Sequence, residues 1–210
     1  MRKWYPAALV AVAFLVSAIL YPRLPDRIAT HWGLDGQPNG WSSRGMGAFL
    51  VPAILLLVWG VMRWLPSIDP RRANYVKFQE TYDLVVNAVL TLVAGIHFMV
   101  LAIALGWPVP VGRIVPMGVG ALFILLGNVL PRARPNWWFG VRTPWTLSSD
   151  QVWTRTHRVA GYLLTGAGIV CVAGAALSPR WTVGVLAAAV AIASLGSVIY
   201  SYVAWKQEQP

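Results

Sequence analysis

Six long apolar runs dominate this chain of 210 residues. A helix that crosses the hydrocarbon core of a bilayer needs about 20 mainly apolar residues, and each run approaches that length. Hydrophobic residues make up 57% of the chain and charged residues only 11%, which is outside the range of soluble domains. The sequence therefore predicts an all-α integral membrane bundle with six transmembrane helices, at 4–21, 46–65, 84–105, 109–130, 159–177 and 181–205.

The basic residues are distributed unevenly among the connections. Loops rich in Lys and Arg stay on the cytoplasmic side of a membrane. An N-in, C-in orientation puts twelve of the 17 basic residues inside. These are Arg2, Lys3, Arg63, Arg71, Arg72, Lys77, Arg132, Arg134, Arg142, Arg155, Arg158 and Lys206. The net charge of +10 then reflects orientation and contact with membrane lipids, and we expect no direct binding of nucleic acid.

One membrane domain, 1–210, accounts for the whole chain. Within it we expect a two-helix N-terminal unit, 1–65, with an outward loop at 22–45. A four-helix region, 66–210, follows, with a cytoplasmic loop at 131–158.

The outward loop is dense in turn residues. Asp35-Gly36 and Asn39-Gly40 are strong turn signals because glycine takes positive φ at little cost. We expect a shaped loop with a recognition surface. No second His or Cys lies near its histidine, so a metal site is not expected. The candidate ligand-binding residues are His31, Trp32, Asp35, Gly36 and Trp41.

The cytoplasmic loop at 131–158 is also predicted to be ordered, because prolines on both sides of Gly140 restrict its backbone. Ser148 and Gln151 have the spacing of a capping box, which predicts a helix from there into the fifth span. Two interpretations of Arg142 stay open. Its guanidinium either supports loop carbonyls or binds an anionic group of a lipid or partner.

Trp153 and His157 are four residues apart, so they share a face of that helix. We expect His157 to be a structural histidine bonded to a loop carbonyl, because no nucleophile or paired carboxylate accompanies it.

The second connection begins with Asp69, which is placed to cap a helix that starts at Pro70. Beyond it, polar residues at steps of three and four share one helix face that enters the bilayer. The residues on this face are Glu80, Asp83, Asn87, Thr91, Ala94 and His97, all polar except Ala94. Asn87 and His97 either hydrogen-bond to neighbouring helices as packing contacts or line a path for a proton or ligand.

Three segments resemble one known family. Residues 127–161, GNVLPRARPNWWFGVRTPWTLSSDQVWTRTHRVAG, are similar to the signature of the SdpI family. Residues 68–78, IDPRRANYVKF, are similar to that family's second cytoplasmic loop. The pattern L-P-x-x-I-x-x-H-W-x-x-x-G at 24–36, followed by W-S-S-R, resembles a small N-terminal domain of unknown function in bacterial SdpI-type membrane proteins.

This resemblance implies a multi-pass immunity-type protein of the bacterial cell membrane. Such a protein gives resistance to a secreted, membrane-active toxin peptide and also signals by holding a transcriptional repressor at the membrane. The outward loop would meet the toxin, and the signature loop would contact a regulator or hold the bundle together. The signature residues are Asn128, Asn136, Gly140, Arg142, Thr143, Pro144, Trp145, Trp153, His157 and Arg158.

The sequence shows no catalytic constellation, so we expect neither an enzyme nor a bound cofactor or metal. The alternative function is a small transporter or peptide-handling membrane protein with a polar path along the third span. A wide polar cavity lined by Asn87 and His97 would favour transport, whereas a sealed bundle would favour immunity or scaffolding.

Overall fold

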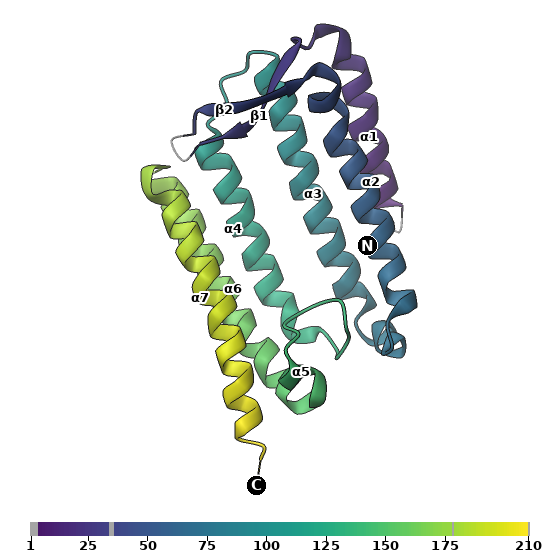
Figure 1. The fold of residues 1–210 in the computed structure, drawn as a ribbon, viewed down its shortest axis with the longest axis vertical. Coiled ribbons are helices and arrows are strands. Elements are labelled where there is room, and N and C mark those ends of the chain that lie inside the picture. The colour runs from purple at the N-terminus through teal and green to yellow at the C-terminus, as the bar shows by residue number, and fades with distance from the viewer. Residues whose placement is uncertain (1–3, 34–35, 178, 210) are drawn as a thin grey trace.

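The computed structural model describes residues 4–33, 36–177 and 179–209, with the backbone alone for 179–183. Six helices in the described chain are long and apolar enough to cross a membrane, which confirms the predicted six-helix bundle. They run alternately between two ends of the molecule (Figure 1). In chain order they are α1 (Tyr5–Leu20), α2 (Arg44–Ile68), α3 (Gln79–Ala104), α4 (Val111–Val129), α6 (Asp150–Leu177) and α7 (Pro179–Lys206).

The short elements define the two ends. One end, which we call the hairpin end, carries η1 (Tyr21–Arg23), β1 (Arg27–Trp32) and β2 (Pro38–Ser43) (Figure 1). The opposite end, the signature end, carries η2 (Arg72–Lys77), η3 (Leu130–Arg132) and α5 (Pro144–Ser148).

The long helices pack in two groups of three. Val10 and Leu55 join Ala94 in the core between α1, α2 and α3. In the other group α6 makes extensive contacts with both α4 and α7, and Cys171 and Ala193 are buried between α6 and α7. Here α3 packs with the N-terminal pair of helices, while the domain boundary at residues 65 and 66 stays a prediction.

Glycines allow the backbones of α4 and α6 to approach closely. A Cβ on Gly120 would lie 2.8 Å from the carbonyl oxygen of Gly168, and one on Gly161 would lie 2.6 Å from the carbonyl oxygen of Gly127. Small residues give this geometry in membrane helices because dispersion contacts between backbones replace the hydrophobic effect there. The pairs are therefore a main contact of the C-terminal group.

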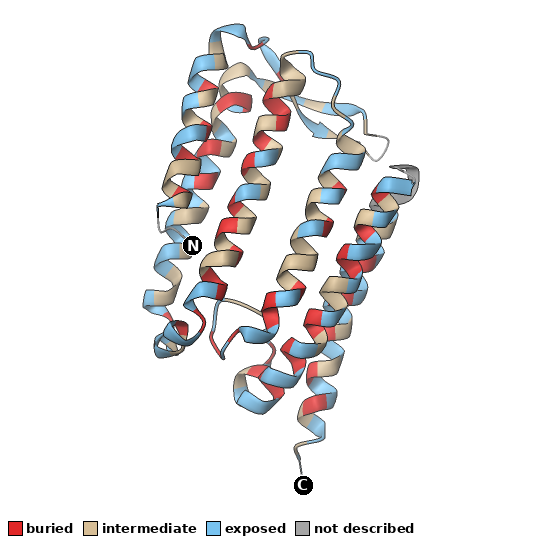
Figure 2. Cartoon of the chain, turned by 180° about the vertical axis from the view of Figure 1, so that it is seen from behind, coloured by how far each residue is buried: buried red, intermediate tan, exposed pale blue. Residues whose placement is uncertain are grey.

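Exposed residues lie along all the long helices (Figure 2), and many of them are large and apolar. On α7, Ile192, Leu195 and Ile199 are each more than 60% exposed. An apolar surface of this extent is unfavourable in water, but it suits hydrocarbon. The surface agrees with a multi-pass membrane protein.

A β-hairpin, which the sequence reasoning did not predict, covers the hairpin end of α2 and α3. Strands β1 and β2 are antiparallel, with Ile28 opposite Ser42. Ile28 is buried against α2, where a Cβ on Gly47 would lie 2.8 Å from the Ile28 Cβ. Leu101 of α3 belongs to the same core cluster. The hairpin is therefore docked on the helices rather than free above them.

Candidate functional site

The hairpin presents some of its predicted binding residues outward and buries others. His31 is exposed, and its Nδ1 donates a hydrogen bond to Asn39 Oδ1 across the hairpin (2.5 Å). Trp41 is 50% exposed, whereas Trp32 is half-buried against the apolar cluster on α2 and α3. Of the predicted binding residues that the structure describes, His31 and Trp41 are therefore the exposed ones.

The tip and base of the hairpin are held in place. Gly36 has φ of 75°, in the left-handed region that favours glycine, and its backbone lies against Gly112 at the start of α4. Asp35, another predicted contact, lies outside the described residues. At the base, Arg44 donates to the Asp26 carboxylate (2.5 Å).

At the signature end, Asn136 organises the loop that follows η3. Its side chain is fully buried. The Oδ1 atom accepts hydrogen bonds from the backbone N–H groups of Trp138 (2.9 Å) and Phe139 (2.6 Å). The Nδ2 group donates to the carbonyls of Arg134 (2.8 Å) and Phe139 (3.0 Å). One amide thus satisfies four backbone groups of its own loop.

Asp69 ties this loop to the connection between α2 and α3. The residue is 2% exposed. Its Oδ2 accepts from the backbone N–H of Trp137 (2.9 Å) and from Tyr75 Oη (3.1 Å), and its Oδ1 accepts from Arg71 N (2.7 Å). Tyr75 Oη also lies 3.3 Å from Asn136 Oδ1. The carboxylate therefore joins two segments that are far apart in the sequence.

Burial and the neighbouring Asp69 carboxylate raise the pKa of Tyr75 far above its usual value. The phenol consequently stays protonated and remains a donor to Asp69.

Sequence reasoning missed this role of Asp69. The predicted helix from Pro70 is wrong, because α2 ends at Ile68 and α3 begins at Gln79, with a turn and the 3-10 helix η2 between them. Asp69 caps the turn through Arg71 N. The only sign of this role in the sequence was that Asp69 is a lone acidic residue within a basic loop. Its distant partner, the backbone N–H of Trp137, could not be identified from the sequence.

His157 is the second buried anchor of the signature loop. Its Nε2 accepts a hydrogen bond from the backbone N–H of Val141 (3.0 Å), and its Nδ1 donates to the carbonyl of Trp153 one turn earlier (2.8 Å). Its ring stacks on the Trp153 ring with centroids 4.0 Å apart. The expected loop carbonyl is thus replaced by a loop N–H, which requires the neutral ring with the proton on Nδ1.

Gly140 lies against the Nε2 edge of the His157 ring. Its φ is +106°, and a Cβ at this position would collide with His157 Nε2. The close approach explains why a glycine stands next to Val141, whose N–H must reach the ring.

The helix start after Gly140 lies earlier than predicted. Thr143 caps α5 in a capping box with Thr146, and Pro144 occupies the first turn. The predicted box with Ser148 and Gln151 is wrong, because Ser148 Oγ donates to the carbonyl of Trp145 (3.0 Å). Ser148 cannot cap a new helix because it is the last residue of α5, which Thr143 already caps.

Ser149 instead caps the start of α6, because its Oγ accepts from the backbone N–H groups of Gln151 (3.2 Å) and Val152 (3.1 Å). From there α6 continues unbroken to Leu177, as expected of the fifth span.

Further contacts attach the signature loop to the helices. Thr143 Oγ1 donates to Ser201 Oγ of α7 (3.0 Å), and Trp145 packs on Tyr202 with ring centroids 5.1 Å apart. The buried Trp153 donates from Nε1 to the carbonyl of Ala133 (2.9 Å). The loop is therefore fixed to both α6 and α7.

Other residues in and near the signature loop are exposed. Trp137 and Trp138 are 48% and 40% exposed, and exposed Arg142 donates from Nη1 to the carbonyl of Trp137 (3.0 Å). We call these three residues the exposed rim. Arg158 is also exposed, on α6. Asn128, in the last turn of α4, donates to the carbonyl of Ile124 in its own helix (2.7 Å).

The two intramembrane polar residues have different surroundings. His97 is fully buried, and its Nε2 lies 2.9 Å from Ser17 Oγ of α1. Asn87, about 15 Å away along α3, lines a cavity near the signature end. The described residues include no group of three His, Cys, Asp or Glu side chains that could hold a metal ion.

Parts of this chain match known protein families. Residues 132–201 match the SdpI/YfhL protein family, and residues 8–56 match a domain of unknown function, DUF1648. The chain is 28% identical over 199 residues to the immunity protein SdpI of Bacillus subtilis (strain 168), which covers 95% of this chain and 93% of the relative. No solved structure matches. The two partial family matches and the similarity along nearly the whole chain show that this protein resembles the SdpI family in both its N-terminal part and its signature region.

Proposed function

We propose that this protein is an immunity protein that gives resistance to a membrane-active toxin peptide. The supporting observation is the similarity to the immunity protein SdpI over 95% of the chain, which includes both the hairpin and the signature loop. A transfer of function is more secure when the loops match as well as the apolar helices, because any two membrane proteins share apolar composition.

The hairpin is the proposed contact for the toxin. His31 and Trp41 are exposed on a docked hairpin whose base is held by Asp26 and Arg44. A rigid aromatic and hydrogen-bonding surface loses little conformational entropy on binding. Under the N-in, C-in orientation this surface faces outward, where a secreted peptide arrives.

The signature loop has a different proposed role. Asn136, Thr143, Trp153 and His157 are buried and bonded within the protein, so they hold the helices in place and are not accessible to a partner. A transcriptional repressor at the cytoplasmic face would meet the exposed rim of Trp137, Trp138 and Arg142.

Transport along α3 has less support. His97 is enclosed and bonded to Ser17, which favours a packing role for this residue. Asn87 lines a cavity, but it lies near the signature end and not beside His97. The polar stripe therefore does not act as one continuous path in this proposal.

Expression in a peptide-sensitive bacterium tests the proposal. Cells with the wild-type protein and cells with an empty vector are challenged with a panel of secreted membrane-active peptides, and survival is measured. Cells that express the relative SdpI serve as the comparison. Protection against at least one peptide is the expected result, and no protection against any of them, at equal membrane expression, would remove the proposal.

The orientation has its own test. The native Cys171 is buried between helices, so an introduced surface cysteine is labelled against a low background. A membrane-impermeant maleimide should label Ser42→Cys in intact cells and should label Ser148→Cys only after lysis. The reverse pattern would contradict the N-in, C-in orientation.

A further inference from the structure

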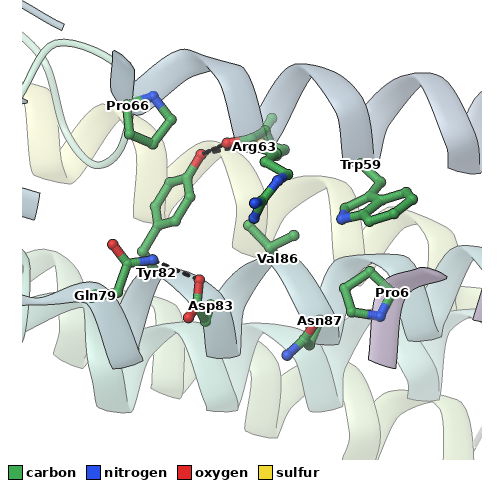
Figure 3. A pocket seen from close by; sticks show the side chains of 10 residues that line it. Pro6, Trp59, Arg63, Pro66, Gln79, Tyr82, Asp83, Val86 and Asn87 are labelled. Atoms are coloured by element: carbon green, nitrogen blue, oxygen red, sulfur yellow. Dashed lines mark hydrogen bonds between the residues drawn. The ribbon is translucent and has the colours of Figure 1, made fainter. Parts of the chain in front are cut away.

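A cavity of about 530 Å³ opens beside α3 near the signature end. It exists because α1 has 16 residues while α2 and α3 have 25 and 26, so α1 leaves the last turns of α2 and the first turns of α3 uncovered. Its lining includes Pro6, Trp59, Arg63, Tyr82, Asp83 and Asn87. Figure 3 shows Arg63 extending from α2 toward α3.

The cavity holds two opposite charges that do not neutralise each other. Among the residues that the structure describes, Arg63 has neither an ion-pair nor a hydrogen-bond partner. Asp83 accepts one hydrogen bond from Gln79 (2.8 Å). Tyr82 does not engage either charge, because its hydroxyl donates to the carbonyl of Met62 (2.5 Å). A guanidinium and a carboxylate are thus available to one ligand.

An apolar groove of about 390 Å³ adjoins the cavity. Asn87 lines both spaces, and Tyr5 of the groove is next to Pro6 of the cavity. The groove lies between α3 and α4, where Leu84 and Leu92 face Gly118 and Leu125. From Leu84 to Leu92 it extends about 12 Å along α3, away from the signature end and toward the middle of the bundle.

We propose that the cavity and groove together bind one phospholipid with an amine-bearing, zwitterionic headgroup. The phosphate contacts the Arg63 guanidinium, because arginine matches phosphate oxygens with two parallel donors. The ammonium contacts the Asp83 carboxylate, and an acyl chain fills the groove. The polar part of the site lies at the edge of the spans and the apolar part toward their centre, which is how a lipid is oriented in a bilayer.

The presence of Asp83 selects the headgroup. A purely anionic lipid would place a phosphate or hydroxyl against this carboxylate, whereas an ethanolamine ammonium gains a charge-assisted hydrogen bond there. Trp59 also lines the cavity, one helical turn before Arg63 on α2. The inference stands on this geometry and does not depend on the immunity function.

The test measures lipid retention by native mass spectrometry. The full chain, in detergent, is supplied with phosphatidylethanolamine or phosphatidylglycerol of identical acyl chains. Wild type is expected to retain one phosphatidylethanolamine in preference to phosphatidylglycerol. Arg63→Gln should lower retention of both lipids about tenfold, which corresponds to about 1.4 kcal/mol, and Asp83→Asn should abolish the preference between them.

Ala121→Trp, which fills the groove from α4, should lower retention without changing headgroup preference, and it provides an independent arm if a charge variant fails to fold. Arg155→Gln is the matched control, because Arg155 is exposed on α6 away from the cavity. Equal retention of the two lipids by wild type, or equal retention by Arg63→Gln and Arg155→Gln, would overturn the proposal. Loss of peptide resistance in Arg63→Gln with unchanged lipid retention would also overturn it, in favour of a peptide ligand.

Discussion

The carboxylate of Asp69 accepts a hydrogen bond from the backbone N–H of Trp137 (2.9 Å), although 68 positions separate the two residues. This contact joins the connection between α2 and α3 to the signature loop between α4 and α6. It links the two groups of three helices at the signature end, at a site away from the contacts between α3 and α4.

Replacing Asp69 by alanine should therefore destabilise the whole bundle. The change removes the acceptor of three hydrogen bonds, from Arg71, Tyr75 and Trp137. A buried donor without a partner costs about 1–3 kcal/mol. We expect a clear fall in the melting temperature of the detergent-solubilised protein.

Asp150→Asn is the matched control for Asp69→Ala. Asp150 is also acidic and contacts Arg71 (3.1 Å), but its side chain is 75% exposed. Exposed ion pairs contribute about 0–1 kcal/mol, so this variant should melt close to wild type. Equal melting of the two variants would show that Asp69 is not an anchor.

Replacing His157 by phenylalanine should loosen the signature loop. The phenyl ring preserves the stacking on Trp153 but offers no acceptor to the backbone N–H of Val141. We expect faster hydrogen exchange at Val141 and a loss of about 1–3 kcal/mol in the free energy of unfolding. Arg158→Gln, at an exposed neighbouring position, should change neither quantity, and slow exchange at Val141 in His157→Phe would refute the contact.

Gly140→Ala, which adds a single methyl group, should lower the melting temperature strongly. Alanine there would have to adopt φ near +106° and would collide with His157. Strain of this kind costs about 1–3 kcal/mol before the collision is counted. Gly60→Ala in α2, where a Cβ meets nothing within 4 Å, should melt at or above the wild-type temperature. Similar melting of both variants would mean that the loop does not approach His157 closely.

The approach of α4 to α6 can be tested in the same way. Gly161→Ala places a Cβ 2.6 Å from the carbonyl oxygen of Gly127, so the helices must separate and lose dispersion contacts. We expect reduced recovery of folded protein in size-exclusion chromatography. Gly166→Ala, on the same helix and with open space around it, should behave as wild type. A normal yield of Gly161→Ala would contradict the close contact.

Local patterns were sufficient to predict the elements that depend on local sequence. Hydropathy alone located six spans because each helix must satisfy its own backbone in lipid. The signature motif also identified Asn136, Gly140 and His157 as special positions. Asn136 acts mostly on its own loop, so its spacing within the motif carried the information.

Partners that are distant in the chain could not be predicted. Asp69 meets Trp137 only after the bundle has assembled, and His157 receives the Val141 N–H instead of a carbonyl because Gly140 brings the backbone close to Nε2 of the ring. The glycine pairs between α4 and α6 were missed for the same reason. The turn residues of the hairpin were evident in the sequence. The strands were missed because they are held by the contact of Ile28 with Gly47 of α2, which no local pattern indicates.

The proposed function requires the hairpin end for resistance. The test uses one membrane-active peptide against which the wild-type protein protects cells. Its minimum inhibitory concentration is measured for cells that express wild type, Trp41→Ala or Trp64→Ala at equal levels. Trp41 and Trp64 are both exposed tryptophans, 50% and 57%, one on the hairpin and the other near the opposite end of α2. Wild type and Trp64→Ala should raise this concentration and Trp41→Ala should not. Equal resistance from both variants would rule out the hairpin as the toxin contact, and none from wild type would rule out the immunity function.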